Sequence, residues 1–122
     1  MALPLKRSNA PIFWLLFGAG GMLAALIGPM LVFITGIGPQ LGWVLPADIL
    51  SYPQVLAFAK SATGKLFLFT VVTLFTWHAA HRIYHTLHDL GIRASAISKT
   101  ICYGISLICT AISLSTLLAI GF

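Results

Sequence analysis

The chemistry that this chain can offer is concentrated in one short stretch that contains all of its histidines. Six ionisable residues lie there: His78, His81, Arg82, His85, His88 and Asp89. At about 100° per residue they fall on one helical face, within an arc of roughly 120°. Because ionisable groups beside hydrocarbon are costly, such a face is typical of a proton pathway or a ligand site.

The composition around this face is that of a membrane protein. Apolar residues make up 59% of the chain and charged residues only 7%, and the mean hydropathy is +1.01. A water-soluble domain carries about 25% charged residues. The net charge of +5 does not indicate nucleic-acid binding, because the basic residues flank apolar runs and form no basic stripe. We therefore expect one domain, residues 1–122, within a lipid bilayer.

Three apolar stretches are long enough to cross a bilayer, since a spanning helix needs about 20 predominantly apolar residues. The expected helices cover about residues 12–37, 60–86 and 100–120. Prolines in the first connection predict a loop, with a short interfacial helix near 52–59. Gly91 predicts the C-cap of the second helix. The fold class is thus an all-α membrane protein with three transmembrane helices.

The orientation follows from the distribution of basic residues. Five of them belong to the end that holds the N-terminus and the second connection: Lys6, Arg7, Arg82, Arg93 and Lys99. Lys60 and Lys65 belong to the other end or snorkel toward it. The positive-inside rule then predicts the N-terminus inside and the C-terminus outside. The histidine face and Trp14 would both lie at the cytoplasmic end, at nearly the same depth.

Small residues in the first span predict close packing against another helix. Gly20, Ala24 and Gly28 recur every four residues, which lets two backbones approach closely. Pro29 is expected to kink this helix, because it lacks a backbone N–H. Three helices make a thin bundle, so we expect a partner, either a second copy or a different membrane subunit.

Several sites are compatible with the histidine face. The plainest is a wetted helix end, where Arg82 meets lipid phosphate and Trp14 belongs to an interfacial aromatic belt. The histidine spacing would also suit a transition metal, but no HExxH or open three-ligand pattern occurs, and we expect no metal. Bis-histidine haem ligation needs a histidine from each of two helices, so a partner would have to supply the second.

A redox-active quinone is the remaining candidate ligand. Its two carbonyl oxygens require hydrogen-bond donors, which Arg82 and the indole N–H of Trp14 supply permanently. His85 can donate or accept a hydrogen bond. Histidine also titrates near neutral pH, so it can exchange the protons that accompany two-electron quinone chemistry. A site at the membrane rim would let a hydrophobic tail stay in lipid.

Four sequence blocks carry a recognisable family pattern. They are KRS at 6–8, PIFWLLFGAGGM at 11–22, SYPQVLAFA at 51–59 and HRIYHTLHDL at 81–90. In combination they resemble the D subunit of fumarate reductase, the smaller hydrophobic anchor of bacterial menaquinol:fumarate reductase. The similarity runs from residue 6 to about 104, and the third helix resembles the family mainly by hydropathy and length. Residues 8–10 depart from the family, which often carries an acidic residue there.

The resemblance implies a membrane anchor that pairs with a second, similar anchor (the C subunit) in the bacterial inner membrane. Together they would hold a flavoprotein and an iron–sulfur protein on the cytoplasmic face. Menaquinol would be oxidised near that face during anaerobic respiration. Electrons would pass through iron–sulfur clusters to FAD, where fumarate becomes succinate. The chain would be a non-catalytic subunit that binds none of these cofactors alone.

The family's quinol-site positions correspond to Trp14, Arg82 and His85 in this chain. We expect His81, His88 and Asp89 to support that site or to form a proton path, with His78 at its rim. Two other functions stay open at this point. One is a stand-alone transporter or proton channel that uses the histidine face. The other is an anchor of a haem-containing succinate dehydrogenase.

Overall fold

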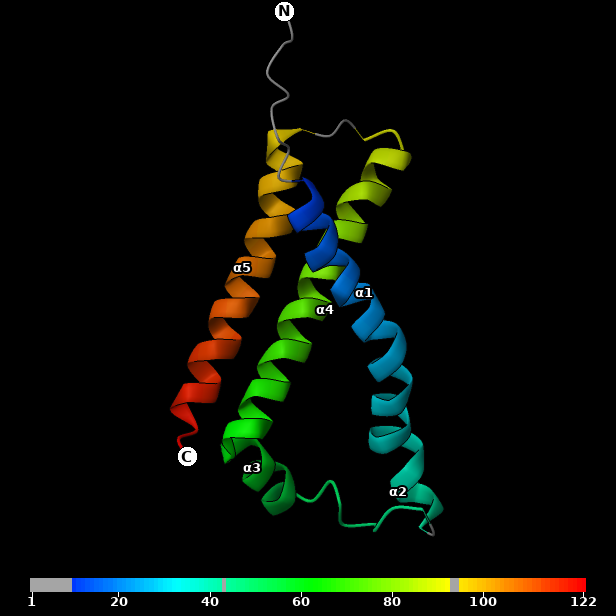
Figure 1. Cartoon of the computed structure of the whole chain (residues 1–122), viewed down its shortest axis with the longest axis vertical. Helices are drawn as coiled ribbons and strands as arrows, with labels where there is room; N and C mark the ends of the chain where they lie inside the picture. The colour runs from blue at the N-terminus through cyan, green and yellow to red at the C-terminus, as the bar shows by residue number, and fades with distance from the viewer. Residues whose placement is uncertain (1–9, 43, 93–94) are drawn as a thin grey trace, which may run out of the picture.

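The computed structural model describes residues 10–42, 44–92 and 95–122, and this part of the chain is built from helices and their connections (Figure 1). In order the helices are α1 (Ala10–Val32), the π-helix η1 (Phe33–Ile37), α2 (Gly38–Leu41), α3 (Tyr52–Lys60), α4 (Ala62–Asp89) and α5 (Ala96–Ala119). Three stretches are long and apolar enough to cross a membrane: Phe17–Leu41, Ala62–Asp89 and Ala96–Ala119. The predicted three-span all-α fold is confirmed, as is the short helix before the second span.

Cap residues set the helix ends. Ser61 and Ser95 precede α4 and α5, and each hydroxyl accepts a hydrogen bond from the backbone N–H three residues on, at 3.0 and 3.1 Å. Gly91 follows α4 with a φ of 80°, and its N–H donates to the His88 carbonyl at 3.0 Å. This left-handed glycine terminates the helix as the sequence predicted. Because α4 continues to Asp89, the whole histidine face is helical.

The first span is irregular in its second half. Pro29 lies inside α1, and the backbone becomes π-helical one turn later, at Phe33–Ile37. In this segment the Gly38 N–H bonds to the Phe33 carbonyl. Thr35 donates its hydroxyl to the Leu31 carbonyl at 2.7 Å. The disturbance predicted at Pro29 therefore takes the form of a π-helical segment that follows the proline.

Helix α4 lies between α1 and α5, and α1 crosses it near one end of the bundle (Figure 1). The crossing is close at Gly20, where an added Cβ would lie 2.7 Å from the Leu74 carbonyl oxygen. Beyond it the two helices diverge, and an added Cβ at Gly28 would meet nothing within 4 Å. The predicted close packing is confirmed at Gly20 and does not extend to Gly28. A cleft of about 270 Å³ opens between the diverging halves, lined by Leu23, Ile27, Thr63, Leu66, Phe67, Thr70 and Val71.

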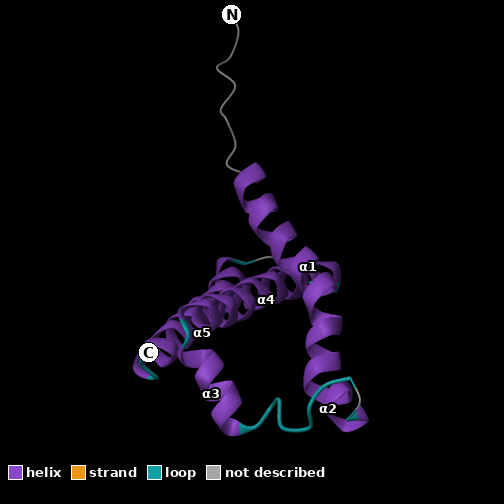
Figure 2. Ribbon diagram, turned by 60° about the horizontal axis from the view of Figure 1, so that its bottom comes forward, coloured by secondary structure: helices purple, strands orange, loops and turns teal. Residues whose placement is uncertain are grey.

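Helices α4 and α5 run alongside one another (Figure 2). Polar side chains join them. The Trp77 indole N–H donates to the Thr110 hydroxyl at 3.0 Å. Ser106 is only 1% exposed, and its hydroxyl lies 3.5 Å from the Thr76 carbonyl oxygen across the interface. Because water is absent from the bilayer core, the bond to Thr110 satisfies an indole N–H that would otherwise be unpaired, whereas the Ser106 hydroxyl also donates to the Cys102 carbonyl of its own helix at 3.3 Å.

A buried lysine joins three helices at the end where the C-terminus lies. Lys65 is 9% exposed, and its ammonium donates to the Ala59 carbonyl at 3.0 Å and to the Leu117 carbonyl at 2.7 Å. The ammonium also lies 5.0 Å from the centre of the Phe122 ring. Carbonyls at helix C-termini carry partial negative charge, so a cation is favourable there. Lys65 is therefore a packing residue of this end and does not reach into solvent.

Candidate functional site

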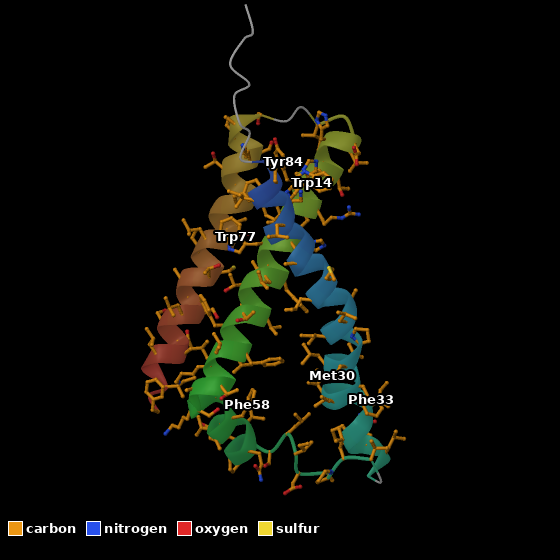
Figure 3. The ribbon with its side chains drawn as sticks, in the orientation of Figure 1. Trp14, Met30, Phe33, Phe58, Trp77 and Tyr84 are labelled. Carbon is orange, nitrogen blue, oxygen red and sulfur yellow. The ribbon has the colours of Figure 1, made fainter. Side chains whose placement is uncertain are left out.

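The candidate site lies where the start of α1 meets the last third of α4. Figure 3 shows Trp14 and Tyr84 at this same end of the bundle. A cleft of about 230 Å³ opens here, hereafter the Trp14 cleft, lined by Trp14, Phe17, Gly18, His78, His81 and Arg82. The fold thus brings the predicted residues Trp14 and Arg82 to the same cleft from two different helices. Arg82 is its permanently charged donor.

His78 links the two helices beneath this cleft. Its Nδ1 lies 2.9 Å from the Phe17 carbonyl oxygen. The ring rests against Gly21, where an added Cβ would lie 2.7 Å from the His78 Cε1. The expectation that His78 is a rim residue is therefore wrong. It packs into the α1–α4 crossing, because the glycines of α1 leave room for an imidazole there.

His81 sits between aromatic side chains from both neighbouring helices. Its ring stacks on Phe17, with centroids 4.0 Å apart and planes inclined by 9°. Its Nδ1 lies 2.9 Å from the Tyr103 hydroxyl on α5. His81 therefore has its ring plane fixed by α1 and one ring nitrogen fixed by α5.

His85 extends the histidine face toward the end of α4. Its ring centroid is 4.4 Å from that of His81, in an edge-on arrangement. The Tyr84 ring centroid lies 5.5 Å from that of His85. His85 is exposed and does not line the Trp14 cleft. Its ring contacts His81, which does line the cleft. His88 and Asp89 are exposed in the last turn of α4, and the cleft lining does not include them.

A second cleft of about 350 Å³, hereafter the Lys99 cleft, lies beside the first and is lined by Phe17, Trp77, Lys99 and Tyr103. Sequence analysis missed Tyr103, Phe17 and Lys99 as parts of this region. A signal was present for Tyr103, since an aromatic hydroxyl in an apolar span needs a hydrogen-bond partner. The partner could not be named because the rotation of α5 about its axis is not visible in the sequence.

Across residues 10–42, 44–92 and 95–122, no group of three or more histidine, cysteine or acidic side chains gathers as a metal would require. Cys102 and Cys109 on α5 are free thiols. The arrangement can donate hydrogen bonds through Arg82 and Trp14 and can exchange protons through its imidazoles.

Comparison with known proteins identifies the family. The family model for the D subunit of fumarate reductase matches residues 4–118. The chain belongs to the fumarate reductase D-subunit family. It is 44% identical over 108 residues to the fumarate reductase D subunit of Vibrio cholerae serotype O1 (strain M66-2), which covers 88% of this chain and 82% of that protein. It is 43% identical over 98 residues to the corresponding protein of Shewanella sp. (strain W3-18-1), covering 80% of each chain.

This membership confirms the resemblance carried by the four sequence blocks. With three helices apolar enough to cross a bilayer, this family member is a multi-pass membrane protein and a membrane-anchor subunit of a fumarate reductase. The blocks at 11–22 and 81–90 contain residues that line the Trp14 cleft. The family pattern therefore coincides with the place where α1 and α4 meet.

Proposed function

We propose that this chain is a single anchor domain that forms part of a menaquinol oxidation site in fumarate reductase. The observation that carries the proposal is the Trp14 cleft, where Trp14 from α1 meets Arg82 and His81 from α4. Trp14 is 79% exposed, so a partner must complete the wall of the site. The second membrane anchor of the enzyme, its C subunit, is the partner that family membership favours.

The residues around the Trp14 cleft suit the chemistry of quinol oxidation. Conversion of menaquinol to menaquinone releases two electrons and two protons. Arg82 and the Trp14 indole N–H can hold the ring oxygens as they become carbonyls, because both are donors. His85 or His81 can take up the protons, since imidazole titrates near neutral pH. The apolar surface around the cleft leaves room for the quinol tail in lipid.

The remaining chemistry belongs to the partner proteins in this proposal. An iron–sulfur protein and a flavoprotein carrying FAD dock on the cytoplasmic face, and the electrons reach fumarate through them. By sequence position, five of the seven Lys and Arg residues lie before the first span, near the end of the second span or near the connection that follows it. The positive-inside rule therefore favours an orientation with this end at the cytoplasmic face of the bacterial inner membrane. The site would then lie beside the iron–sulfur protein.

Two substitutions test the site in the purified four-chain complex. We expect Arg82→Leu and His85→Leu each to lower menaquinol-driven fumarate reduction by about tenfold or more, the effect of losing a hydrogen bond to a charged group. Fumarate reduction by an artificial electron donor should stay unchanged, because that route bypasses the membrane anchors. Lys60→Gln, an exposed cation near the opposite end, is the matched control. Wild-type menaquinol turnover in both site variants would refute the assignment.

A mild-detergent pull-down separates this proposal from the two competing functions. Co-purification of flavin, iron and a second anchor supports a fumarate reductase anchor. Purification as a homo-oligomer without flavin or iron supports a stand-alone transporter or proton channel. A haem signal in the reduced-minus-oxidised spectrum supports an anchor of the succinate dehydrogenase type.

A further inference from the structure

Two clefts lie on either side of Phe17. Phe17 lines both the Trp14 cleft and the Lys99 cleft. The Trp14 cleft contains His81 and the Lys99 cleft contains Tyr103. Phe17 is apolar and cannot pass a proton from one cleft to the other. A proton that crosses here must therefore use a hydrogen-bonded pair.

The His81–Tyr103 pair supplies this connection. The His81 Nδ1 and the Tyr103 hydroxyl oxygen are 2.9 Å apart, well within hydrogen-bond distance. Each partner lines a different cleft. His81 is held in place by stacking on Phe17, and Tyr103 lies among the rings of Trp77 at 6.1 Å and Tyr84 at 5.9 Å. Both groups are thus fixed in position by aromatic packing.

His78, one turn before His81 on α4, is unsuited to passing a proton between the two clefts. His78 also lines the Trp14 cleft, but its Nδ1 faces the Phe17 backbone carbonyl at 2.9 Å. A carbonyl oxygen accepts a hydrogen bond and has no proton to pass on. Tyr103 differs, because a phenol both accepts and donates.

We infer that the His81–Tyr103 pair carries protons from the Trp14 cleft to the Lys99 cleft during menaquinol oxidation. This inference rests on the proposed function. Before each passage the His81 Nδ1–H donates to the Tyr103 oxygen. A menaquinol hydroxyl gives its proton to Nε2, the Nδ1 proton moves to Tyr103, and Tyr103 releases its own proton to water. One O–H bond of menaquinol is replaced by one O–H bond to water, and His81 is left with its proton on Nε2. The first tautomer is restored when the ring turns away from Tyr103 and exchanges its proton with water in the Trp14 cleft, which takes the Nε2 proton and supplies the Nδ1 proton.

The Lys99 cleft can receive that proton. Its volume of about 350 Å³ is enough for several water molecules, each of which takes up about 30 Å³ in the liquid. Lys99 and the Tyr103 hydroxyl give the cleft polar groups that hold such water. Lys99 lies in the first turn of α5 and is exposed, so the cleft is continuous with the end of the bundle.

Tyr103→Phe tests the inference in the four-chain complex, because it keeps the ring and removes only the hydroxyl. We expect kcat for menaquinol oxidation to fall by about tenfold with little change in KM, since the quinol contacts are untouched. Tyr84→Phe removes the hydroxyl of a neighbouring tyrosine and should keep the wild-type kcat. The artificial-donor assay and the flavin content report assembly of each variant.

Chemical rescue separates a proton carrier from a packing residue. Added imidazole can accept protons in place of a missing relay group, so it should restore turnover in Tyr103→Phe. A purely structural defect would not respond to imidazole. In the double variant His81→Gln and Tyr103→Phe, we expect the same turnover as in His81→Gln alone, because the two residues act in series.

Three results would overturn the relay: wild-type kcat in Tyr103→Phe, a slow variant that imidazole does not restore, or additive losses in the double variant. Any of these, combined with impaired Arg82→Leu and His85→Leu variants, would leave the quinol site in place and refute the relay alone. Normal turnover in Arg82→Leu and His85→Leu would instead refute the site on which the relay depends.

Discussion

The two tryptophans described at the candidate site and at the α4–α5 interface differ in the surroundings of their indole N–H groups. Trp14 is exposed at the Trp14 cleft, whereas Trp77 donates to Thr110 at 3.0 Å within the α4–α5 interface. We expect Trp14→Phe to raise KM for menaquinol about fivefold, the effect of one lost hydrogen bond, without affecting stability. Trp77→Phe should leave KM unchanged and destabilise the anchor by about 1 kcal/mol. Steady-state kinetics and thermal unfolding in detergent measure the two effects.

The opposite effects of the two substitutions would contradict the assignment of Trp14 to quinol binding and of Trp77 to packing. If Trp14→Phe lowered the unfolding midpoint and kept the wild-type KM, the indole of Trp14 would belong to packing rather than to quinol binding. If Trp77→Phe raised KM, the site would extend into the Lys99 cleft, which Trp77 also lines.

At the residue scale, the sequence could predict which polar side chains gather at the candidate site but not how they pair. Arg82 and Trp14 could be placed together because the topology puts both at one end of the bundle. The pairing of His81 with Tyr103 depends on the rotation of α5 against α4, and composition does not determine rotation. His78 was misplaced for the same reason, since its contact with the Phe17 carbonyl needs the α1–α4 crossing to be known.

At the scale of the helices, the α1–α4 crossing determines where Trp14 stands. An added Cβ at Gly20 would lie 2.7 Å from the Leu74 carbonyl oxygen, and the backbone there cannot move aside cheaply. We expect Gly20→Ala to force α1 away from α4, lowering menaquinol turnover several-fold and reducing the yield of assembled complex. Gly28→Ala is the matched control, since its Cβ would meet nothing within 4 Å. Equal behaviour of the two variants would show that the crossing does not position the site.

Helix lengths and ends were largely predictable, whereas the irregular part of α1 was not. Helix ends depend on nearby residues that are visible in the sequence, here the caps Ser61, Ser95 and Gly91. The expected and observed helix ends therefore agree to within a few residues. The π-helical segment Phe33–Ile37 lies beyond the proline that suggested a kink. A π-helical turn leaves no simple composition signal, because the same apolar residues suit an α-helix equally well.

At the scale of the whole molecule, Lys65 ties the ends of α3 and α5 to the start of α4. We expect Lys65→Met to keep the apolar stem but to release the Ala59 and Leu117 carbonyls, destabilising the anchor by about 2 kcal/mol. Hydrogen exchange in the last turn of α5 should accelerate. Lys60→Met, which changes an exposed lysine nearby, should leave both quantities unchanged. A wild-type rate of amide hydrogen exchange in Lys65→Met would mean that apolar packing alone holds the last turn of α5 against α4.

The divergence of α1 from α4 also bears on the fate of an anchor that has not yet found its partners. Beyond Gly20, α1 leaves α4, and the cleft of about 270 Å³ between them is lined mainly by apolar side chains. The α4–α5 hairpin is joined along its length, so it is complete as soon as both helices are inserted. Helix α1 contacts α4 around Phe17, Gly20 and Gly21, and its second half meets little of the described part of the chain. We therefore expect a copy without its partners to be degraded faster in the membrane than an assembled one, because the second half of α1 lacks a packing surface.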